Sequence, residues 1–135
     1  MGNVEELVKK VFEEVEREVP GIKGMVLATL DGLPIVSDVA SVEQKNRLAA
    51  MVSALAALAR RMGPELNVGD FEGISVDFSG GRIFCYTIKD TAIFAIATLK
   101  DINLGMLNLV VPSALEKISN IISSGGSHER ERIND

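Results

Sequence analysis

The sequence has little of the residue types that build metal centres, disulfides and many catalytic sites. Among its 135 residues there are one cysteine, one histidine and no tryptophan. The lone cysteine, Cys85, excludes an intramolecular disulfide, and one cysteine with one histidine is too small a set for a zinc site. The sequence therefore predicts no metal and no cofactor.

The chain also lacks a surplus of basic residues and any long apolar run. Its 14 lysines and arginines are outnumbered by 19 aspartates and glutamates, which leaves a formal net charge of −5 at pH 7. This balance argues against binding to a nucleic-acid backbone or an anionic membrane patch, because both need clustered basic side chains. No apolar run reaches the roughly 18 residues that span a bilayer, and the N-terminus is charged rather than signal-like. We therefore expect a cytoplasmic protein that does not insert into membranes.

The rest of the composition is that of a globular domain. Hydrophobic residues make up 47% and charged residues 24%, and the length is sufficient for one domain with a core. We predict a single domain over residues 1–122. Residues 123–135 read SSGGSHERERIND, a polar run that contains the histidine, His128, and that we predict to be a disordered tail.

Three segments show the spacing of amphipathic helices. The first covers residues 4–18. The second covers residues 41–62, opens with a serine capping box and is expected to stop at Gly63-Pro64. The third covers residues 103–123 and contains Pro112, which should kink it or split it in two.

Five segments have the alternation or the apolar run of β-strands. Strands 23–30 and 91–99 are apolar on both alternating sets, so they are expected in the middle of a sheet. Strand 33–37 contains Pro34 and belongs at one edge, because proline cannot donate to a ladder. The other two predicted strands cover residues 72–78 and 82–88.

The order α-β-β-α-β-β-β-α predicts an α/β (α+β) fold, in which a five-stranded, mainly antiparallel sheet has helices on both faces. Strand 72–78 is the expected second edge. It contains neither proline nor lysine, so no residue in it blocks pairing with another strand.

The second helix is alanine-rich where a surface helix is usually polar. A broad apolar arc is predicted to face the core, consisting of Leu48, Met51, Val52, Leu55, Leu58, Ala59 and Met62. The opposite arc carries small side chains, namely Ala50, Ser53, Ala54 and Ala57. Small side chains let another backbone approach closely, which indicates a contact surface. The alternative is that alanine is present as the best helix former.

The unprotected strand and the small helix face follow one another in the chain, and together they predict a two-fold symmetric dimer. Strand 72–78 would pair with its copy, and the second helix would lie beside its copy. The predicted interface consists of the four small helix residues with Met51 and Leu58, and of Glu72, Ile74, Ser75, Val76 and Asp77 on the strand.

Three segments together resemble the Roadblock/LC7 family. They are Val19-Pro-Gly-Ile-Lys-Gly-Met-Val-Leu-Ala-Thr-Leu-Asp-Gly-Leu-Pro-Ile35, the alanine-rich Leu48–Met62, and Asp101-Ile-Asn-Leu-Gly-Met-Leu107 leading to Ala114-Leu-Glu-Lys-Ile118. The resemblance covers about residues 4–122 and is greatest to prokaryotic members similar to the polarity protein MglB. Pro112 departs from the family pattern, since a proline is unexpected in the middle of the third helix.

The resemblance implies a non-enzymatic protein that forms a homodimer or a heterodimer with a continuous sheet. Members of the family bind Ras-like small GTPases or act as adaptors. Our leading hypothesis is a dimeric, allosteric regulator of a Ras-like small GTPase, which docks on the paired second helices. The alternative is a structural adaptor or scaffold subunit that pairs with itself or with another Roadblock/LC7 chain. An enzyme of unknown type is a third hypothesis, although no convergent set of catalytic residues supports it.

Three arginines on the second helix, Arg47, Arg60 and Arg61, are the candidates for contact with a partner. An arginine supplied in trans can stabilise the charge that develops in phosphoryl transfer. The alternatives are ordinary surface charge, or compensation of the dipole at the end of the helix.

No residue is expected to be catalytic. Cys85 lies in an apolar strand without a nearby base, which favours a plain buried thiol. The carboxylates Asp70, Glu72, Asp77 and Asp90 lack the paired, enclosed setting that acid–base catalysis needs, so they are predicted to be solvated surface charges.

Overall fold

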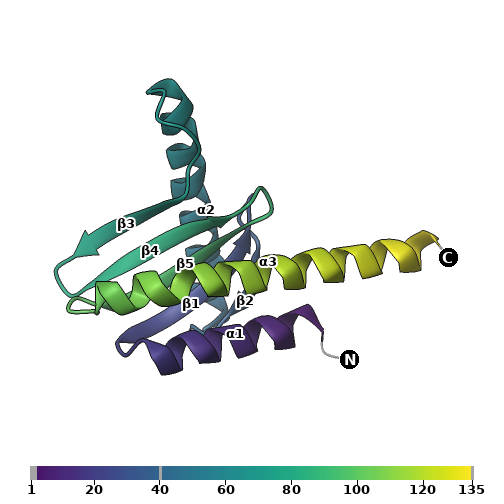
Figure 1. Ribbon diagram of the computed structural model, residues 1–135, viewed down its shortest axis with the longest axis horizontal. Helices are drawn as coiled ribbons and strands as arrows, with labels where there is room; N and C mark the ends of the chain where they lie inside the picture. Colours follow the sequence, from purple (N-terminus) through teal and green to yellow (C-terminus); the bar gives the residue numbers. More distant parts are fainter. Residues whose placement is uncertain (1–2, 40, 135) are drawn as a thin grey trace. The chain divides into compact units, whose positions relative to one another are not determined.

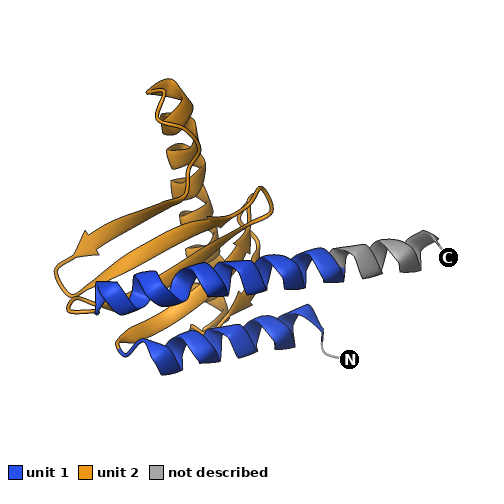
Figure 2. Ribbon diagram, in the orientation of Figure 1, with its two compact units in different colours: residues 1–20, 103–135 blue, residues 21–102 orange. Residues whose placement is uncertain are grey.

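The computed structural model describes residues 3–39 and 41–134, with side chains up to residue 125. The chain divides into two compact units (Figure 2). Residues 21–102 form a unit that contains the sheet and one helix, and residues 1–20 with 103–135 form a unit of two helices.

The sheet has five strands in the order β2-β1-β5-β4-β3, and each strand pairs antiparallel with its neighbours (Figure 1). The strand bounds are Ile22–Thr29 for β1, Pro34–Ser37 for β2, Gly73–Phe78 for β3, Gly81–Ile88 for β4 and Ala92–Leu99 for β5. This arrangement confirms the predicted fold class. The proline-containing β2 and the unprotected β3 are the two edges, and the two-sided apolar strands β1 and β5 lie inside the sheet.

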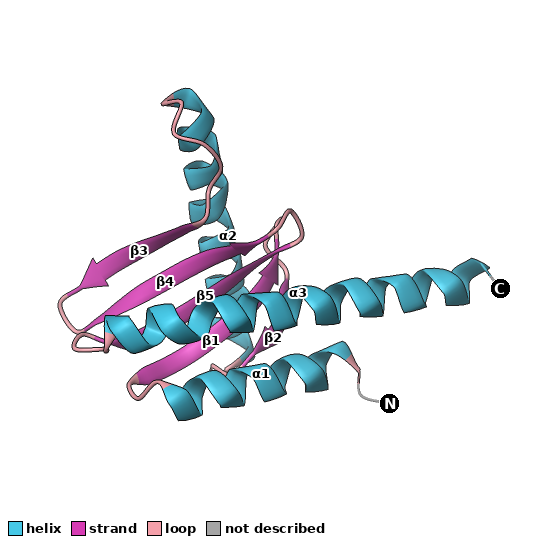
Figure 3. Cartoon of the chain, viewed as in Figure 1, coloured by secondary structure: helices cyan, strands magenta, loops and turns pink. Residues whose placement is uncertain are grey.

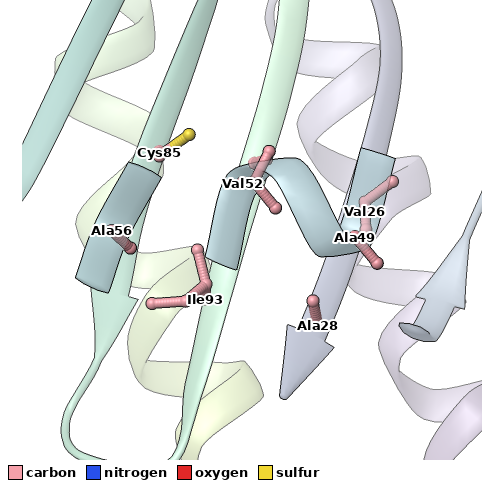
Figure 4. Close-up of a cluster of buried hydrophobic side chains, with 8 residues drawn as sticks. Val26, Ala28, Ala49, Val52, Ala56, Cys85 and Ile93 are labelled. Carbon is pink, nitrogen blue, oxygen red and sulfur yellow. The ribbon is translucent and has the colours of Figure 1, made fainter. Parts of the chain in front are cut away.

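Helix α2, Val42–Glu65, packs on one face of the sheet and connects β2 to β3 (Figure 3). Its N-terminus is capped by Ser41, whose hydroxyl accepts a hydrogen bond from the Gln44 backbone N–H at 3.1 Å, as the capping box predicts. The core beneath it is built from buried residues of α2 and three strands, namely Val26, Ala28, Ala49, Val52, Ala56, Cys85, Ile93 and Ala95 (Figure 4).

The end of α2 differs from the prediction, because the helix continues through Gly63 and Pro64 to Glu65. It ends where Asn67 adopts a left-handed conformation with φ 57°. The Asn67 N–H then donates to the Pro64 carbonyl at 3.2 Å, and the Val68 N–H donates to the Gly63 carbonyl at 3.0 Å. These are the two bonds of a Schellman motif. Pro64 removes only one hydrogen bond of the helix, so the helix can continue through it. Asn67, with its positive φ, turns the chain out of the helical path, and α2 therefore ends before it.

The helical unit pairs α1, Val4–Glu18, with α3, Leu104–Asn134. The predicted bounds of α1 are confirmed, and its N-cap Asn3 accepts a hydrogen bond from the Glu6 backbone N–H at 2.8 Å. Lys117 of α3 donates to the Glu14 carboxylate at 2.8 Å. This ion pair lowers the pKa of Glu14 and raises the pKa of Lys117, mainly through the hydrogen bond and secondly through the charges.

Helix α3 contradicts two expectations. It is continuous through Pro112, so the predicted split is wrong. Pro112 and Asn108, whose carbonyl loses its helical partner, are both exposed, so water can satisfy that carbonyl.

The helix also continues to Asn134, through residues 123–134 that were predicted to form a disordered tail. A helix already formed can propagate into a segment without proline, where glutamate and arginine favour the helix and the glycines oppose it. The His128 side chain lies outside the described residues. Within the described residues, no helix is long and apolar enough to cross a membrane.

Candidate protein-interaction surface

The outward side of α2 is apolar, which is unusual for a helix on a surface. Met51 is 61% exposed, Leu58 59% and Met62 52%, and Ala54 is exposed between them. These four residues recur at spacings of three or four and lie along one side of the helix. We call them the outward arc. A contiguous apolar surface of this kind is typical of a protein interface.

The inward side of α2 carries mainly small residues, so the predicted orientation of the helix is wrong in part. Val52 is buried, and Leu48 and Leu55 pack against the core, as predicted. Ala49, Val52, Ser53 and Ala56 are buried, whereas Met51, Leu58 and Met62, which were predicted to face the core, are exposed. Ser53 was predicted to lie at a dimer interface. Its buried hydroxyl instead donates to the Thr29 carbonyl of β1 at 2.9 Å.

The reason for this orientation is the close approach of α2 to the turn between β1 and β2. A side chain placed on Gly32 would put its Cβ 3.4 Å from the Ala50 Cα. Gly32 follows Asp31 in the tight turn between β1 and β2 and has φ 98°, a conformation that favours glycine. Large side chains on the inward side of α2 would hold the helix away from the sheet, so the small ones face inward.

The remaining predicted helix residues lie at the surface or near it. Ala50 and Ala54 are exposed, and Ala57 is half-buried. Of the six helix residues predicted to form the interface, all but Ser53 therefore keep some exposed surface. The exposed apolar surface is larger than the small-residue face suggested, because the large side chains of the outward arc also belong to it.

The other part of the predicted interface is the edge strand β3. It pairs with β4 on one side, and no strand of the described chain pairs with its other side. Ile74 and Val76 point to the α2 side and are half-buried, while Ser75 and Asp77 are exposed. Glu72 lies one residue before the strand and is also exposed. The backbone groups along this edge are free to pair with another strand.

Polar contacts hold β3 against the rest of the sheet. Arg82 of β4 donates to the Asp77 carboxylate at 2.7 Å and lies over the Phe84 ring, 5.3 Å from its centroid. The Lys100 ammonium donates to the Phe78 carbonyl at the end of β3, at 3.0 Å. An edge strand fixed in this way can present a regular ladder to a partner.

The three candidate arginines are not brought together. Arg47 is exposed and forms an ion pair with Glu43 at 3.4 Å, one helical turn away. Arg61 is exposed and Arg60 half-buried. Arg47 and Arg61 are separated by about 21 Å along α2 at roughly 1.5 Å per residue. One copy of the chain therefore offers two separate cationic positions beside the outward arc, rather than a cluster.

Cys85 is the buried thiol that the sequence predicts. It is fully buried, and burial raises its pKa to about 11. Burial, with a smaller contribution from Cys85, also raises the pKa of Tyr86 to about 12. At neutral pH the thiol is protonated and shielded, which is the opposite of what a nucleophile needs. Among the described residues, no group of three or more histidines, cysteines and carboxylates could hold a metal ion.

Four exposed apolar residues of the same unit, which lie outside α2, were not predicted from the sequence. Leu66 is 68% exposed and Val68 75% exposed in the loop after α2, and Phe78 is 50% exposed at the end of β3. Leu99, at the end of β5, is 44% exposed. The helical periodicity could not find them because they lie outside the helix.

Comparison with known proteins identifies the family of this chain. The Roadblock/LC7 domain model matches residues 7–98 of the chain. The chain belongs to the Roadblock/LC7 family, as its fold, its order of elements and this match show.

Its relatives include an archaeal protein and bacterial structures. An uncharacterized protein of Methanocaldococcus jannaschii is 27% identical over 112 residues, which cover 83% of this chain and 96% of that protein. A structure of MglB with a tetrameric arrangement has a TM-score of 0.82 at 18% identity, covering 93% of this chain and 94% of that one. The gliding protein MglB of Thermus thermophilus has a TM-score of 0.80 at 18% identity, covering 92% and 94%. These structures show that the chain has an MglB-like fold.

Proposed function

We propose that the protein is a non-catalytic homodimer that binds a Ras-like small GTPase in the cytoplasm and biases its nucleotide cycle. The observation that carries this proposal is the apolar outward arc of α2 next to an unpaired, unprotected edge strand. Both features are costly on a monomer, because the first exposes apolar surface and the second invites uncontrolled pairing. A single two-fold symmetric contact with a second copy would cover both the outward arc and the unpaired edge of β3.

In the proposed dimer, β3 pairs antiparallel with its copy, and the two α2 helices lie side by side beneath the joined sheets. The sheet then becomes continuous across the two protomers. Ile74 and Val76, which are half-buried in one copy, would be covered further by the second. The exposed Ala54 lies in the middle of the outward arc, where its small side chain lets the two helices approach closely.

The GTPase would dock on the surface that the paired α2 helices and their arginines form. No residue of this surface needs to do covalent chemistry, because preferential binding to one conformation of the switch segments is enough to shift the nucleotide cycle. Membership of the Roadblock/LC7 family and the likeness to MglB support this role. Arg47 and Arg61 would contribute charge to the contact rather than a catalytic group.

Two variants test the dimer and its link to partner binding. Ala54→Arg places a long charged side chain in the middle of the outward arc, whereas Ala54→Ser keeps the side chain small. We expect light scattering to give a monomer for Ala54→Arg and a dimer for Ala54→Ser, and only the second to bind the GTPase. A dimeric Ala54→Arg variant would contradict this geometry.

The role of the arginines is tested by GTP hydrolysis in the saturated complex. Arg47→Ala and Arg61→Ala should weaken binding of the GTPase but leave the hydrolysis rate of the complex within about a factor of two. Loss of an arginine that acts directly on the transferring phosphoryl group lowers that rate by roughly 10³ to 10⁵. A drop of that size would refute the allosteric role. Arg17→Ala on α1 is the matched control.

If the dimer forms and no Ras-like GTPase binds in either nucleotide state, the adaptor function replaces the regulatory one. The interface of the dimer would be the same, and the search for a partner would turn to other Roadblock/LC7 chains.

A further inference from the structure

Three residues lie side by side at one end of the sheet, on the face that α2 covers elsewhere. Phe78 of β3 is paired with Gly81 of β4, which is paired with Leu99 of β5. Strand residues two apart share a face, and Ile74, Cys85 and Ala95 on the same strands pack in the core beneath α2. Phe78, Gly81 and Leu99 are therefore on the α2 side of the sheet. We call them the end row.

Helix α2 leaves the end row uncovered. The helix packs over Ile74, Cys85 and Ala95 toward the other end of β3, β4 and β5, where residues are buried or half-buried. Phe78 is 50% exposed and Leu99 44% exposed, although they continue the same apolar face. Gly81 between them has no side chain, and a Cβ there would lie 2.5 Å from the Thr98 carbonyl oxygen. The end row thus consists of two apolar side chains, those of Phe78 and Leu99, with a glycine between them.

The C-terminal part of α2 projects past β3 without any strand of its own sheet beneath it (Figure 1). Leu58 and Met62 of the outward arc are exposed there, and Leu66 and Val68 follow in the loop. The Schellman bonds fix this end, and Gly63 packs so closely that a Cβ on it would collide with the Gly69 carbonyl oxygen. These contacts hold the end of α2 in a fixed conformation. We call its exposed apolar residues, Leu58, Met62, Leu66 and Val68, the overhang.

The symmetry of the proposed dimer brings the overhang to the end row. A two-fold axis normal to the sheet, placed beside β3, pairs the Gly73 end of one β3 with the Phe78 end of the other. The overhang passes β3 at the Ile74 end, as the packing of Ile74 beneath α2 shows. Beyond the edge of its own sheet, the overhang therefore continues beneath the partner's sheet, at the Phe78 end of the partner's β3.

We propose that the overhang of each copy seats on the end row of the other copy, with Met62 against Phe78 and Leu99 across the interface. The occupant is a second copy of this chain, because the same chain supplies both the uncovered apolar row and an apolar projection of matching position. The contact occurs twice in each dimer. It rests on the proposed dimer and adds that each protomer completes the core of the other, with Phe78 and Leu99 as interface residues.

Mixed cross-linking tests the contact. Met62→Cys and Phe78→Cys are made in separate chains, one carrying a larger tag, and are mixed and oxidised. Cys85 stays in both chains as a buried, protonated thiol. We expect a disulfide-linked heterodimer from this mixture, and none when Leu33→Cys replaces Phe78→Cys. Leu33 is the matched control because it is 61% exposed but lies at the β1–β2 turn.

The outcomes separate this inference from the proposed function. A wild-type protein that is monomeric by light scattering would overturn the dimer and the contact together. A wild-type dimer whose mixed variants give no link between residues 62 and 78 would overturn the contact alone.

A second measurement avoids dependence on cysteine geometry. Phe78→Asp should weaken the dimer about 100-fold, because each dimer loses the contact twice and each loss is on the order of tenfold. Leu33→Asp should leave the dissociation constant unchanged. Equal dissociation constants for Phe78→Asp and the wild-type protein would overturn the proposal.

Discussion

Replacing Leu58 by alanine separates the proposed interface from the stability of the monomer. Leu58 is 59% exposed in the isolated chain, so only the remaining part of its side chain supports the fold. Complete burial of a leucine is worth about 1.5–3 kcal/mol. The exposed part that a dimer would cover is therefore worth about 1–2 kcal/mol, which makes about 2–4 kcal/mol for two copies.

This energy corresponds to a dissociation constant raised roughly 30- to 700-fold in the variant, since about 1.4 kcal/mol is a factor of ten. The part of the Leu58 side chain that is buried in the monomer is worth about 0.6–1.2 kcal/mol by the same measure. Alanine is a better helix former than leucine and offsets a small part of this loss, so the free energy of unfolding of the monomer should fall by about 1 kcal/mol or less. The dissociation constant is measured by sedimentation equilibrium over a dilution series, and the unfolding free energy by urea denaturation at concentrations where the chain is monomeric.

The matched control is Leu33→Ala, since Leu33 is 61% exposed in the same unit but lies at the β1–β2 turn, at the edge of the sheet opposite β3. It should leave the dissociation constant unchanged. Equal weakening of the dimer by both variants, or an unchanged dissociation constant in Leu58→Ala, would refute the proposed interface.

Three further predictions concern the structure of the unit that carries the interface. Ala56→Leu should lower the free energy of unfolding by about 1–3 kcal/mol in urea denaturation, because Ala56 is fully buried under α2 and a larger side chain overpacks the core. Gly63→Ala should lower the thermal midpoint, whereas Gly80→Ala should not, because a Cβ on Gly63 meets the Gly69 carbonyl and one on Gly80 meets nothing within 4 Å. Stability should fall between about pH 9 and 11, because there the unfolded Cys85 thiol has lost its proton while the folded one, with its pKa raised to about 11, still holds it. Cys85→Ala should remove part of this decline, which pH-dependent urea denaturation measures, and an unchanged decline would contradict the assigned pKa.

The arrangement of the sheet could be predicted because local signals and burial agree. Pro34 marked one edge, and the apolar residues on both faces of β1 and β5 placed these strands inside. Each of these signals acts through the backbone or through burial of a whole strand, so it does not depend on how individual side chains pack.

The orientation of α2 could be predicted only in part, because hydrophobicity alone places all the large apolar side chains inside, whereas only Val52, Leu48 and Leu55 of the predicted arc pack in the core. The packing of Ala50 and Ser53 against the β1–β2 turn is a long-range contact that reverses this order. The methionines of the outward arc, which look like core residues in the sequence, are exposed for that reason. A helix with large apolar residues outside and small ones inside indicates an interface more strongly than the small residues did alone.

The C-terminal ends of α2 and α3 could not be predicted from the sequence either. Pro64 and Pro112 look like helix breakers, yet both lie within helices and are exposed, where the lost hydrogen bond is the main cost. Asn67 ends α2 through its positive φ, which the sequence around it does not single out.

The proposed regulatory function depends on recognition of a GTPase that carries a particular nucleotide. The most direct measurement is the affinity of the purified dimer for Ras-like GTPases of the same organism, each loaded first with GDP and then with a non-hydrolysable GTP analogue. We expect that at least one GTPase binds, with a clear preference for one of the two nucleotide states, and that Ala54→Arg abolishes this binding. Absence of binding in both states, or equal affinity for both, would contradict a regulatory function.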